Sequence, residues 1–231
     1  MTIDSGHGGT LGFSKISQRM NTLKYWAIFL VAVSIGAAAQ AAEEAKALPV
    51  PQMSGGKPVM QALKERKSVR DYTDNKLNDQ QVSDLLWAAF GMNRPEIDHR
   101  TAPSAQNTQD VDIYMATADG LFRYQAKPHQ LIKVSGEDLR SLTSGQPFAK
   151  VAPVQLVYVS DYTRMPKVKP ELRDSYSGID TGCIVQNVYL YCASAGLGAV
   201  VHELDRAPLA KAMGLRPEQH IVIAQTVGVP K

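Results

Sequence analysis

Cysteine is scarce in this chain, and its placement argues against a disulfide or a metal site. The 231 residues include two cysteines, Cys183 and Cys192, and five scattered histidines. We expect both cysteines on one helix, where nine residues separate two side chains by about 180° and by about 13 Å along the axis. A disulfide needs Cα atoms within about 7 Å. We therefore expect two buried thiols, and no His or Cys pattern has the spacing of a metal motif.

Runs of basic residues and internal repeats are also missing. The formal net charge is +3, and lysines and arginines are scattered along the sequence without interleaved aromatics. This pattern argues against nucleic-acid binding. A composition of 44% hydrophobic and 20% charged residues is that of a soluble globular protein, and the length suits one domain with an appendage.

The one membrane-like segment is too short to span a bilayer. Residues 26–39 are apolar, whereas a spanning helix needs roughly 20 such residues. Lys24 precedes the segment and small residues up to Ala41 follow it, which is the pattern of a secretory signal peptide. We expect cleavage after Ala41, a periplasmic or secreted product, and no stable membrane insertion after processing. An uncleaved N-terminal anchor is the alternative, and the sequence does not decide whether translation starts at Met1 or Met20.

The remaining chain divides into an arm and one domain. Residues 1–41 are the signal peptide with an upstream extension, residues 42–57 form a linker or extended N-terminal arm, and residues 58–231 form the domain. Apolar periodicity and capping residues predict helices at 58–66, from 78 to 90, near 136–144, at 178–195 and at 206–213. Alternating or continuous apolar runs predict strands at 111–117, 121–124, 154–160 and 221–230. Helices interspersed with few strands indicate an α+β fold.

The helix at 178–195 is apolar on nearly every face. Such a helix lies either in the centre of a domain or at a subunit interface. We take Val188 as an interface residue, with a wholly internal helix as the alternative. Gly178 and Gly182 would allow close packing against another helix. Gly196 and Gly198 would allow a sharp exit from the helix and a close backbone approach to a ligand.

Two polar segments are candidates for binding. In an extended stretch, Arg66, Ser68 and Arg70 point the same way, and planar guanidinium groups match phosphate oxygens. A solvated basic edge is the alternative. Residues 100–109 offer amide and hydroxyl groups suited to the edge of a heteroaromatic ring, although a plain surface loop would look the same.

Taken together, in this order and spacing, these segments resemble the FMN-dependent nitroreductase family. Residues 66–70 are similar to its RxSxR start and residues 103–107 (PSAQN) to its PSxxN loop. The helix bearing Gln186-Asn187 and ending in Gly-Leu-Gly resembles the family's central helix, and residues 227–230 its closing VGxP. Residues 100–105, 120–124 and 129–131 look closest to the branch of azoline oxidases, the thiazole- and oxazole-forming dehydrogenases of peptide maturation.

The resemblance implies a nitroreductase-like fold, with a central mixed or antiparallel sheet flanked by helices, in a homodimer that holds FMN at its interface. The phosphate and ribityl groups would be bound by Arg66, Lys67, Ser68, Arg70 and Lys231. The partner subunit would cover the ring with Pro103, Ser104, Ala105 and Asn107. The backbone around Val200, Val201 and His202 would face the isoalloxazine edge. Since a flavin carries out its own redox chemistry, no catalytic side chain is assigned.

These implications predict an exported FMN-dependent oxidoreductase that transfers hydride between flavin and a small electron-poor substrate. The alternative is an exported flavin-binding or peptide-maturation accessory module without nitroreductase turnover. His202 is interpreted as either a proton donor beside the flavin or a polar loop residue. The sequence does not identify the substrate or the electron donor, nor whether the protein is a reductase or an oxidase.

Overall fold

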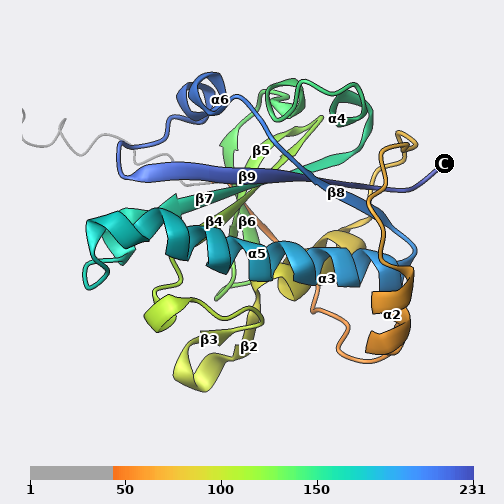
Figure 1. The fold of residues 1–231 in the computed structure, drawn as a ribbon. Helices are drawn as coiled ribbons and strands as arrows, with labels where there is room; N and C mark the ends of the chain where they lie inside the picture. The colour runs from red at the N-terminus through yellow and green to blue at the C-terminus, as the bar shows by residue number, and fades with distance from the viewer. Residues whose placement is uncertain (1–43) are drawn as a thin grey trace, which may run out of the picture. The chain divides into compact units, whose positions relative to one another are not determined.

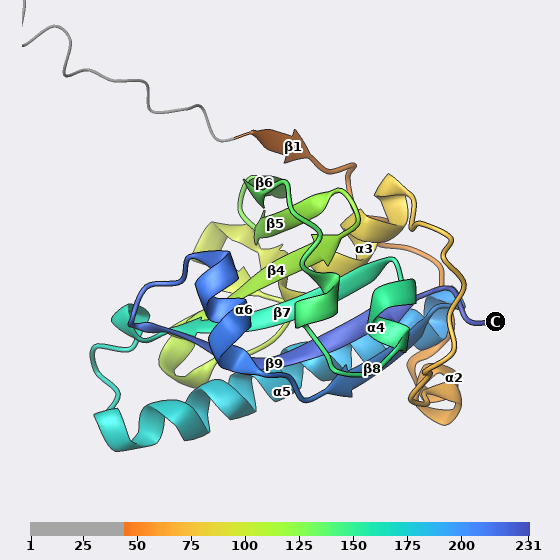
Figure 2. The same cartoon turned by 90° about the horizontal axis from the view of Figure 1, so that it is seen from above.

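The computed structural model describes residues 44–231, so the predicted signal peptide lies outside the described residues. In this part of the chain, seven strands form one sheet in the order β1-β6-β5-β4-β7-β9-β8 (Figure 2). Every neighbouring pair is antiparallel. The strands are β1 (Ala45–Ala47), β4 (Val111–Thr117), β5 (Gly120–Gln125), β6 (Gln130–Ser135), β7 (Val154–Asp161), β8 (Gly198–His202) and β9 (Gln219–Gly228). The expected α+β fold is thus confirmed, and the segment expected to be a linker or arm contributes β1.

Helices cover both faces of this sheet (Figure 1). One face carries α3 (Asp79–Phe90) and α5 (Pro170–Ala195), with α2 (Val59–Glu65) packed on α5; the other carries α4 (Phe148–Val151) and α6 (Arg206–Met213). Alternation along β4 explains the two cores, because successive side chains of a strand point to opposite faces. Ile113 and Met115 join the core beneath α3 and α5, whereas Tyr114 and Ala116 join the core beneath α6.

Short elements complete the fold. A two-stranded hairpin is formed by β2 (Met92–Arg94) and β3 (His99–Arg100). Single 3₁₀ turns are η1 (Pro95–Ile97), η2 (Ala105–Asn107), η3 (Arg140–Leu142) and η4 (Tyr162–Arg164). Among the described helices, none is long and apolar enough to cross a membrane.

Capping residues place two helices where the sequence predicts them. The Asn78 side chain accepts a hydrogen bond from the Gln81 amide at 2.8 Å, and the Gln81 side chain accepts one from the Asn78 amide at 3.0 Å. This reciprocal capping box starts α3, and Gly91 ends it. Asp205 caps α6, and Gly214 ends that helix in the left-handed region with φ of +63°.

The helix predicted near residues 136–144 is wrong. Only the 3₁₀ turn η3 forms there, and a helix first appears at Phe148. Asp138 accepts hydrogen bonds from the Arg140 amide and guanidinium, and the Ser144 hydroxyl accepts one from the Gln146 amide. Such side-chain bonds to nearby backbone compete with the helical pattern, which explains the break.

Helix α5 is longer and more one-sided than its sequence suggests. It starts eight residues before the predicted position, with Pro170 at its first turn. Val188 is 0% exposed within the single chain, whereas Ile179 is 61% exposed. The interpretation of Val188 as an interface residue is therefore wrong, because its side chain fills the core beneath the helix. A Cβ atom at Gly178 or Gly182 would have no neighbour within 4 Å, so neither glycine packs closely against anything in this chain.

The two cysteines on α5 are both free thiols. Cys192 is buried, as expected, and burial raises the pKa of its thiol. Cys183 is only half-buried, so the expectation of two buried thiols holds for one of them.

Candidate functional site

The segment that follows α2 lies along the edge strand β8. Ser68 and Ala199 form a parallel bridge, and the Val69 amide donates to the Ala199 carbonyl at 3.0 Å. A Cβ atom at Gly198 would lie 2.8 Å from the Val69 Cβ. The glycine at 198 therefore permits a close approach, as expected, but the group that approaches is the chain's own segment.

This docking places the predicted phosphate-binding residues together on an open edge. Lys67 and Arg70 are exposed and Arg66 is half-buried. Within residues 44–231 no carboxylate lies within 4 Å of these three cations. Lys231 joins them because its amide donates to the Asp71 carbonyl at 3.2 Å, while its ammonium pairs with the Asp71 carboxylate at 3.3 Å.

Tyr189, on α5, connects three of the predicted residues, and the sequence did not single it out as a binding residue. Its hydroxyl accepts a hydrogen bond from the Val201 amide at 2.8 Å and lies 3.2 Å from the Ser68 hydroxyl. The Arg66 guanidinium lies over its ring, 5.3 Å from the centroid. We call Arg66, Lys67, Ser68, Arg70, Tyr189, Val201 and Lys231 the basic half-site.

His202 lies in β8 and not in a loop, so its interpretation as a polar loop residue is wrong. The side chain is buried; its Nε2 lies 2.9 Å from the Thr226 hydroxyl, and its ring packs edge-on against Phe148. Burial lowers the pKa of the imidazole, which favours the neutral ring. Val200 points into the same cluster, beneath α4. Both side chains thus lie on the sheet face opposite to Ala199, which belongs to the α5 core.

The predicted loop 103–107 forms a turn that hydrogen bonds within the loop and to Gln109 close. Ala105–Asn107 form η2, and Gln106 and Asn107 both adopt left-handed backbone conformations with φ of +53°. The Ser104 hydroxyl accepts a hydrogen bond from the Gln109 amide at 3.0 Å. Pro103, Gln106 and Asn107 are exposed, so the loop presents its outer side to solvent.

A buried carboxylate on α5 anchors this loop. The Ala105 amide donates to both carboxylate oxygens of Asp180, each at 3.0 Å. Asp180 is 3% exposed. We call residues 103–107 together with Asp180 the loop half-site.

The two half-sites lie on different parts of α5. Asp180 and Tyr189 are nine positions apart, which corresponds to about 13 Å along the helix axis. In Figure 1 the segment after α2 lies at the C-terminal end of α5, and the β2–β3 hairpin that leads into the loop lies below its N-terminal half. One chain therefore does not bring all the predicted residues together.

The chemistry of the basic half-site fits a phosphate group. Arg66, Lys67 and Arg70 flank Ser68 in the sequence and have no carboxylate partner among the described residues, and Arg groups bind phosphate oxygens in pairs. The Val201 amide, predicted to face a flavin ring, already donates to Tyr189. The side chains thus suit the phosphate end of FMN, and the ring edge would have to be met by other groups or by movement of Tyr189.

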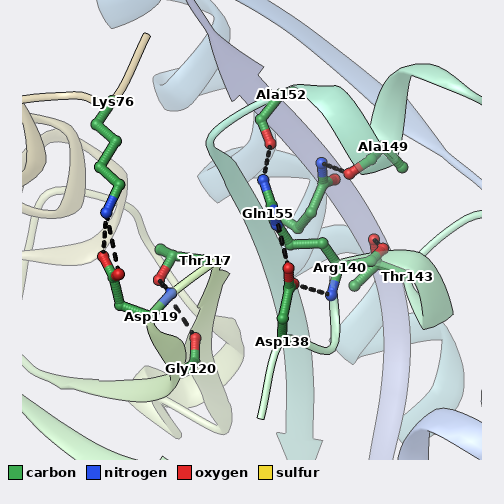
Figure 3. A network of polar contacts seen from close by, with 10 residues as sticks. All are labelled: Lys76, Thr117, Asp119, Gly120, Asp138, Arg140, Thr143, Ala149, Ala152 and Gln155. Atoms are coloured by element: carbon green, nitrogen blue, oxygen red, sulfur yellow. Dashed lines mark hydrogen bonds and ion pairs between the residues drawn. The ribbon is translucent and has the colours of Figure 1, made fainter. Parts of the chain in front are cut away.

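A cavity of about 510 Å³ lies elsewhere, between β1, the β4–β5 turn and α4, and none of the predicted site residues lines it. Its interior includes Leu77, Met115 and Phe122. Its rim carries ion pairs, of which Figure 3 shows Lys76–Asp119 at 2.8 Å and Arg140–Asp138 at 2.7 Å. The cavity wall also carries Lys150, which has no ion pair among the described residues. Because none of the predicted binding residues lines this cavity, we place the candidate site at the two half-sites.

Comparison with known proteins identifies the family of this chain. Residues 63–229 match the model of the nitroreductase family. A protein of Methanocaldococcus jannaschii that is named as a nitroreductase is 31% identical over 148 residues, which cover 60% of this chain and 74% of the relative.

Solved structures show the same fold. A protein of Ralstonia eutropha JMP134, also named as a nitroreductase, is 41% identical with a TM-score of 0.78, covering 84% of this chain and 93% of its own. A structure from Desulfovibrio desulfuricans, named as a nitroreductase in complex with FMN, is 24% identical with a TM-score of 0.55, covering 76% of this chain and 88% of its own. From the match over residues 63–229 and these relatives, we conclude that the chain belongs to the nitroreductase family of oxidoreductases.

Proposed function

We propose that this protein is an exported, FMN-dependent oxidoreductase that acts as a homodimer on a small electron-poor substrate. The observation that carries the proposal is the cluster of cations in the basic half-site, which has no acidic partner for Arg66, Lys67 or Arg70 among the described residues. An FMN complex among the structures of similar fold supports the choice of cofactor.

In this proposal the two half-sites have separate tasks. Arg66, Lys67, Arg70 and Lys231 bind the phosphate, and Ser68 contributes a hydroxyl to the ribityl chain. The partner's copy of the loop half-site covers the ring, which excludes water from one face. Bound FMN supplies two-electron hydride chemistry, and the protein side chains position it.

The exposed face of α5 supports the homodimer. Gly178, Ile179, Gly182 and Gln186 are all exposed; Ile179, Gly182 and Gln186 follow one another at spacings of three and four residues, and Gly178 lies beside Ile179. The exposed Ile179 between two glycines suits a close contact with a second copy, with Gln186 at the edge of that contact. Such a contact would place the loop half-site of one chain near the basic half-site of the other.

Export limits the choice of electron donor. NAD(P)H is a cytosolic metabolite, so a periplasmic or secreted protein either uses another donor or works as an oxidase. Export itself rests on the signal-peptide pattern before Ala41. Intact mass of the native protein tests it, since a retained segment 20–41 would contradict processing.

Flavin content and reduction test the function itself. We expect the purified protein to be yellow and to release FMN on denaturation. The bound flavin should be reduced anaerobically by at least one member of a panel of donors and then reoxidised by an electron-poor substrate. A protein that neither contains nor binds FMN would contradict the proposal. If FMN binds but no combination of electron donor and electron-poor substrate gives turnover, the accessory-module alternative would be favoured.

A further inference from the structure

The central sheet opens between β4 and β5 at one end. The two strands pair from the β4–β5 turn as far as Tyr114 and Arg123, and the pairing stops there. Both strands continue beyond this point, since β4 stays paired with β7 back to Val111 and β5 stays paired with β6 on to Gln125. A pocket of about 320 Å³ lies in this opening, with residues of both strands in its wall.

Three cations line the pocket without a carboxylate partner. They are Arg100 from β3, Arg123 from β5 and Lys127 from the β5–β6 turn. None of the three lies within 4 Å of a carboxylate in the described chain. The wall also contains the carboxylate of Asp112, which is paired with Arg164 at 2.9 Å. The pocket therefore has an excess of positive charge that the described residues do not neutralise.

The Arg100 guanidinium is held in place with hydrogen-bonding capacity to spare. Its Nε donates to the Gln109 side-chain oxygen at 2.6 Å and its Nη1 to the Phe90 carbonyl at 3.1 Å. The guanidinium also lies over the Phe90 ring, 4.5 Å from the centroid. These bonds leave both N–H groups of Nη2 without an acceptor in the described chain. A fixed guanidinium of this kind suits a carboxylate, whose planar oxygens match its donors.

The charge of Arg100 is disfavoured where it lies. Burial, above all, and the nearby Arg164 cation lower the pKa of Arg100, although Tyr124, Asp112 and Asp98 act in the opposite direction. A guanidinium nevertheless stays protonated at physiological pH. An anion in the pocket would offset this unfavourable charge.

The rest of the wall can hold an apolar group. Phe90, Ile113 and Tyr124 are buried and line the pocket. The Tyr124 hydroxyl lies 2.9 Å from the His129 Nδ1 and is thus already hydrogen-bonded within the chain. Small-molecule sites commonly have volumes of about 300–1,000 Å³ and combine apolar walls with a few placed polar groups. The pocket, at the low end of this range, suits a small molecule with an apolar body and an acid group.

We propose that this pocket binds a small organic carboxylate, with the acid group on the three cations and the apolar body against the three buried side chains. No residue of either half-site lines the pocket, so the proposal does not depend on FMN. The pocket nevertheless adjoins the loop half-site, because Gln109 accepts from Arg100 and donates its amide to the Ser104 hydroxyl.

NMR titration of the full-length processed protein tests the proposal, with phenylacetate as the probe. We expect the amide signals of Asp112, Ile113 and Gln125, which lie in the opening, to shift and to saturate. Phenylacetamide has the same apolar body without the charge, and inorganic phosphate has a charge without the body. Each should bind there at least about tenfold more weakly than phenylacetate, because each lacks one of the two contacts.

Substitutions separate the charge of the pocket from its fold. Arg123→Gln removes a cation that has no ion pair in the described chain, so phenylacetate affinity should fall at least about tenfold with the melting temperature unchanged. Arg100→Gln should weaken binding further, and it also removes the bonds to Gln109 and Phe90. Lys211→Gln, at an exposed cation on α6, is the matched control and should keep the wild-type affinity.

Each other outcome overturns a stated part of the proposal. An absence of shifts in the opening, or wild-type affinity in Arg123→Gln, would overturn the site. Phenylacetamide or phosphate that binds as well as phenylacetate would overturn the class of ligand. Shifts at Ser68 and Val201 in place of the opening would assign the anion to the basic half-site instead. A protein that fails to bind FMN yet binds phenylacetate in the opening would contradict the proposed cofactor and support this pocket.

Discussion

The basic half-site and the loop half-site present opposite chemistry at two positions along one helix, α5. In the basic half-site the charges of Lys67 and Arg70 are exposed on the segment that lies along the edge strand β8, where they can meet an anion. In the loop half-site the charged side chain, Asp180, is buried, and exposed loop backbone faces solvent. The basic half-site can bind an anion through its charges, and the loop half-site can cover a bound ligand. Neither half-site alone does both.

Removing the two guanidinium groups should have the largest effect. The double variant Arg66→Ala/Arg70→Ala loses two charge-assisted contacts of about 1.5–3 kcal/mol each, so FMN affinity should fall more than about a hundredfold. Neither cation pairs with a carboxylate in the described chain, so the flavin-free protein should lose only the Arg66–Tyr189 contact and its thermal stability should fall slightly. Fluorescence titration with FMN and thermal denaturation measure the two quantities.

A variant with the same loss of charge elsewhere serves as the control for that experiment. Lys167→Ala/Lys211→Ala removes two exposed cations away from both half-sites and should leave FMN affinity as in the wild type. If the Arg66→Ala/Arg70→Ala protein binds FMN with the same affinity as the wild type, the phosphate must be bound elsewhere.

The two faces of α5 should respond differently to the same new charge. Val188→Glu buries an unpaired carboxylate and should lower the free energy of unfolding by about 3–5 kcal/mol or abolish folding. Ile179→Glu places the charge on the exposed stripe, so the free energy of unfolding of the single chain, without the contribution of subunit association, should change by less than about 0.5 kcal/mol. Urea denaturation measures both.

Light scattering on the same pair tests the interface. Ile179→Glu should be a folded monomer with little flavin, because the stripe is where a second copy is proposed to pack. If Ile179→Glu remains a dimer, the dimer contact must lie on another surface.

The smallest effect is expected at the link between α5 and β8. Tyr189→Phe leaves the Val201 amide without its acceptor, which should lower the free energy of unfolding by about 1–2 kcal/mol. Tyr176→Phe, a half-buried tyrosine on the same helix, should change it by less than about 0.5 kcal/mol. Equal stability of the two variants would mean that the Tyr189 hydroxyl does not stabilise this junction.

Local signals in the sequence predicted elements well where nearby residues satisfy the hydrogen bonds of the backbone at the ends of an element. The capping box at Asn78 and the pair Asp205 and Gly214 each set helix ends that need no tertiary information. The continuous apolar run of β7 likewise predicts a buried central strand, and all its residues are buried.

Elements stabilised by distant partners were missed. The first turns of α5 are mostly exposed and carry no apolar period, so only Pro170 marks their start. The short edge strand β8 was taken for a loop, which led to the wrong setting for His202. Its β-branched pair Val200 and Val201 is a signal that could have identified it.

The sequence predicted individual residues of the candidate site but not the contacts between them. Arg66, Ser68 and Arg70 follow from period 2, and their clustering with Lys231 depends on the way β9 ends beside Asp71. The sequence did not identify Tyr189 and Asp180 as functional residues. Both lie within one long helix, where the local pattern does not distinguish a binding residue from a packing residue. Only the packing of separate segments on α5 distinguishes them.

Subunit complementation tests the central claim, that each complete site takes its basic half-site from one chain and its loop half-site from the other. The Arg66→Ala/Arg70→Ala chain and a Ser104→Ala/Asn107→Ala chain, carrying different tags, are co-expressed and the mixed dimer is isolated. The account predicts that each parent dimer is poor in FMN and that the mixed dimer regains one intact site, with bound flavin to match. A mixed dimer as poor in FMN as its parents would show that each chain builds its site alone, and would contradict the account.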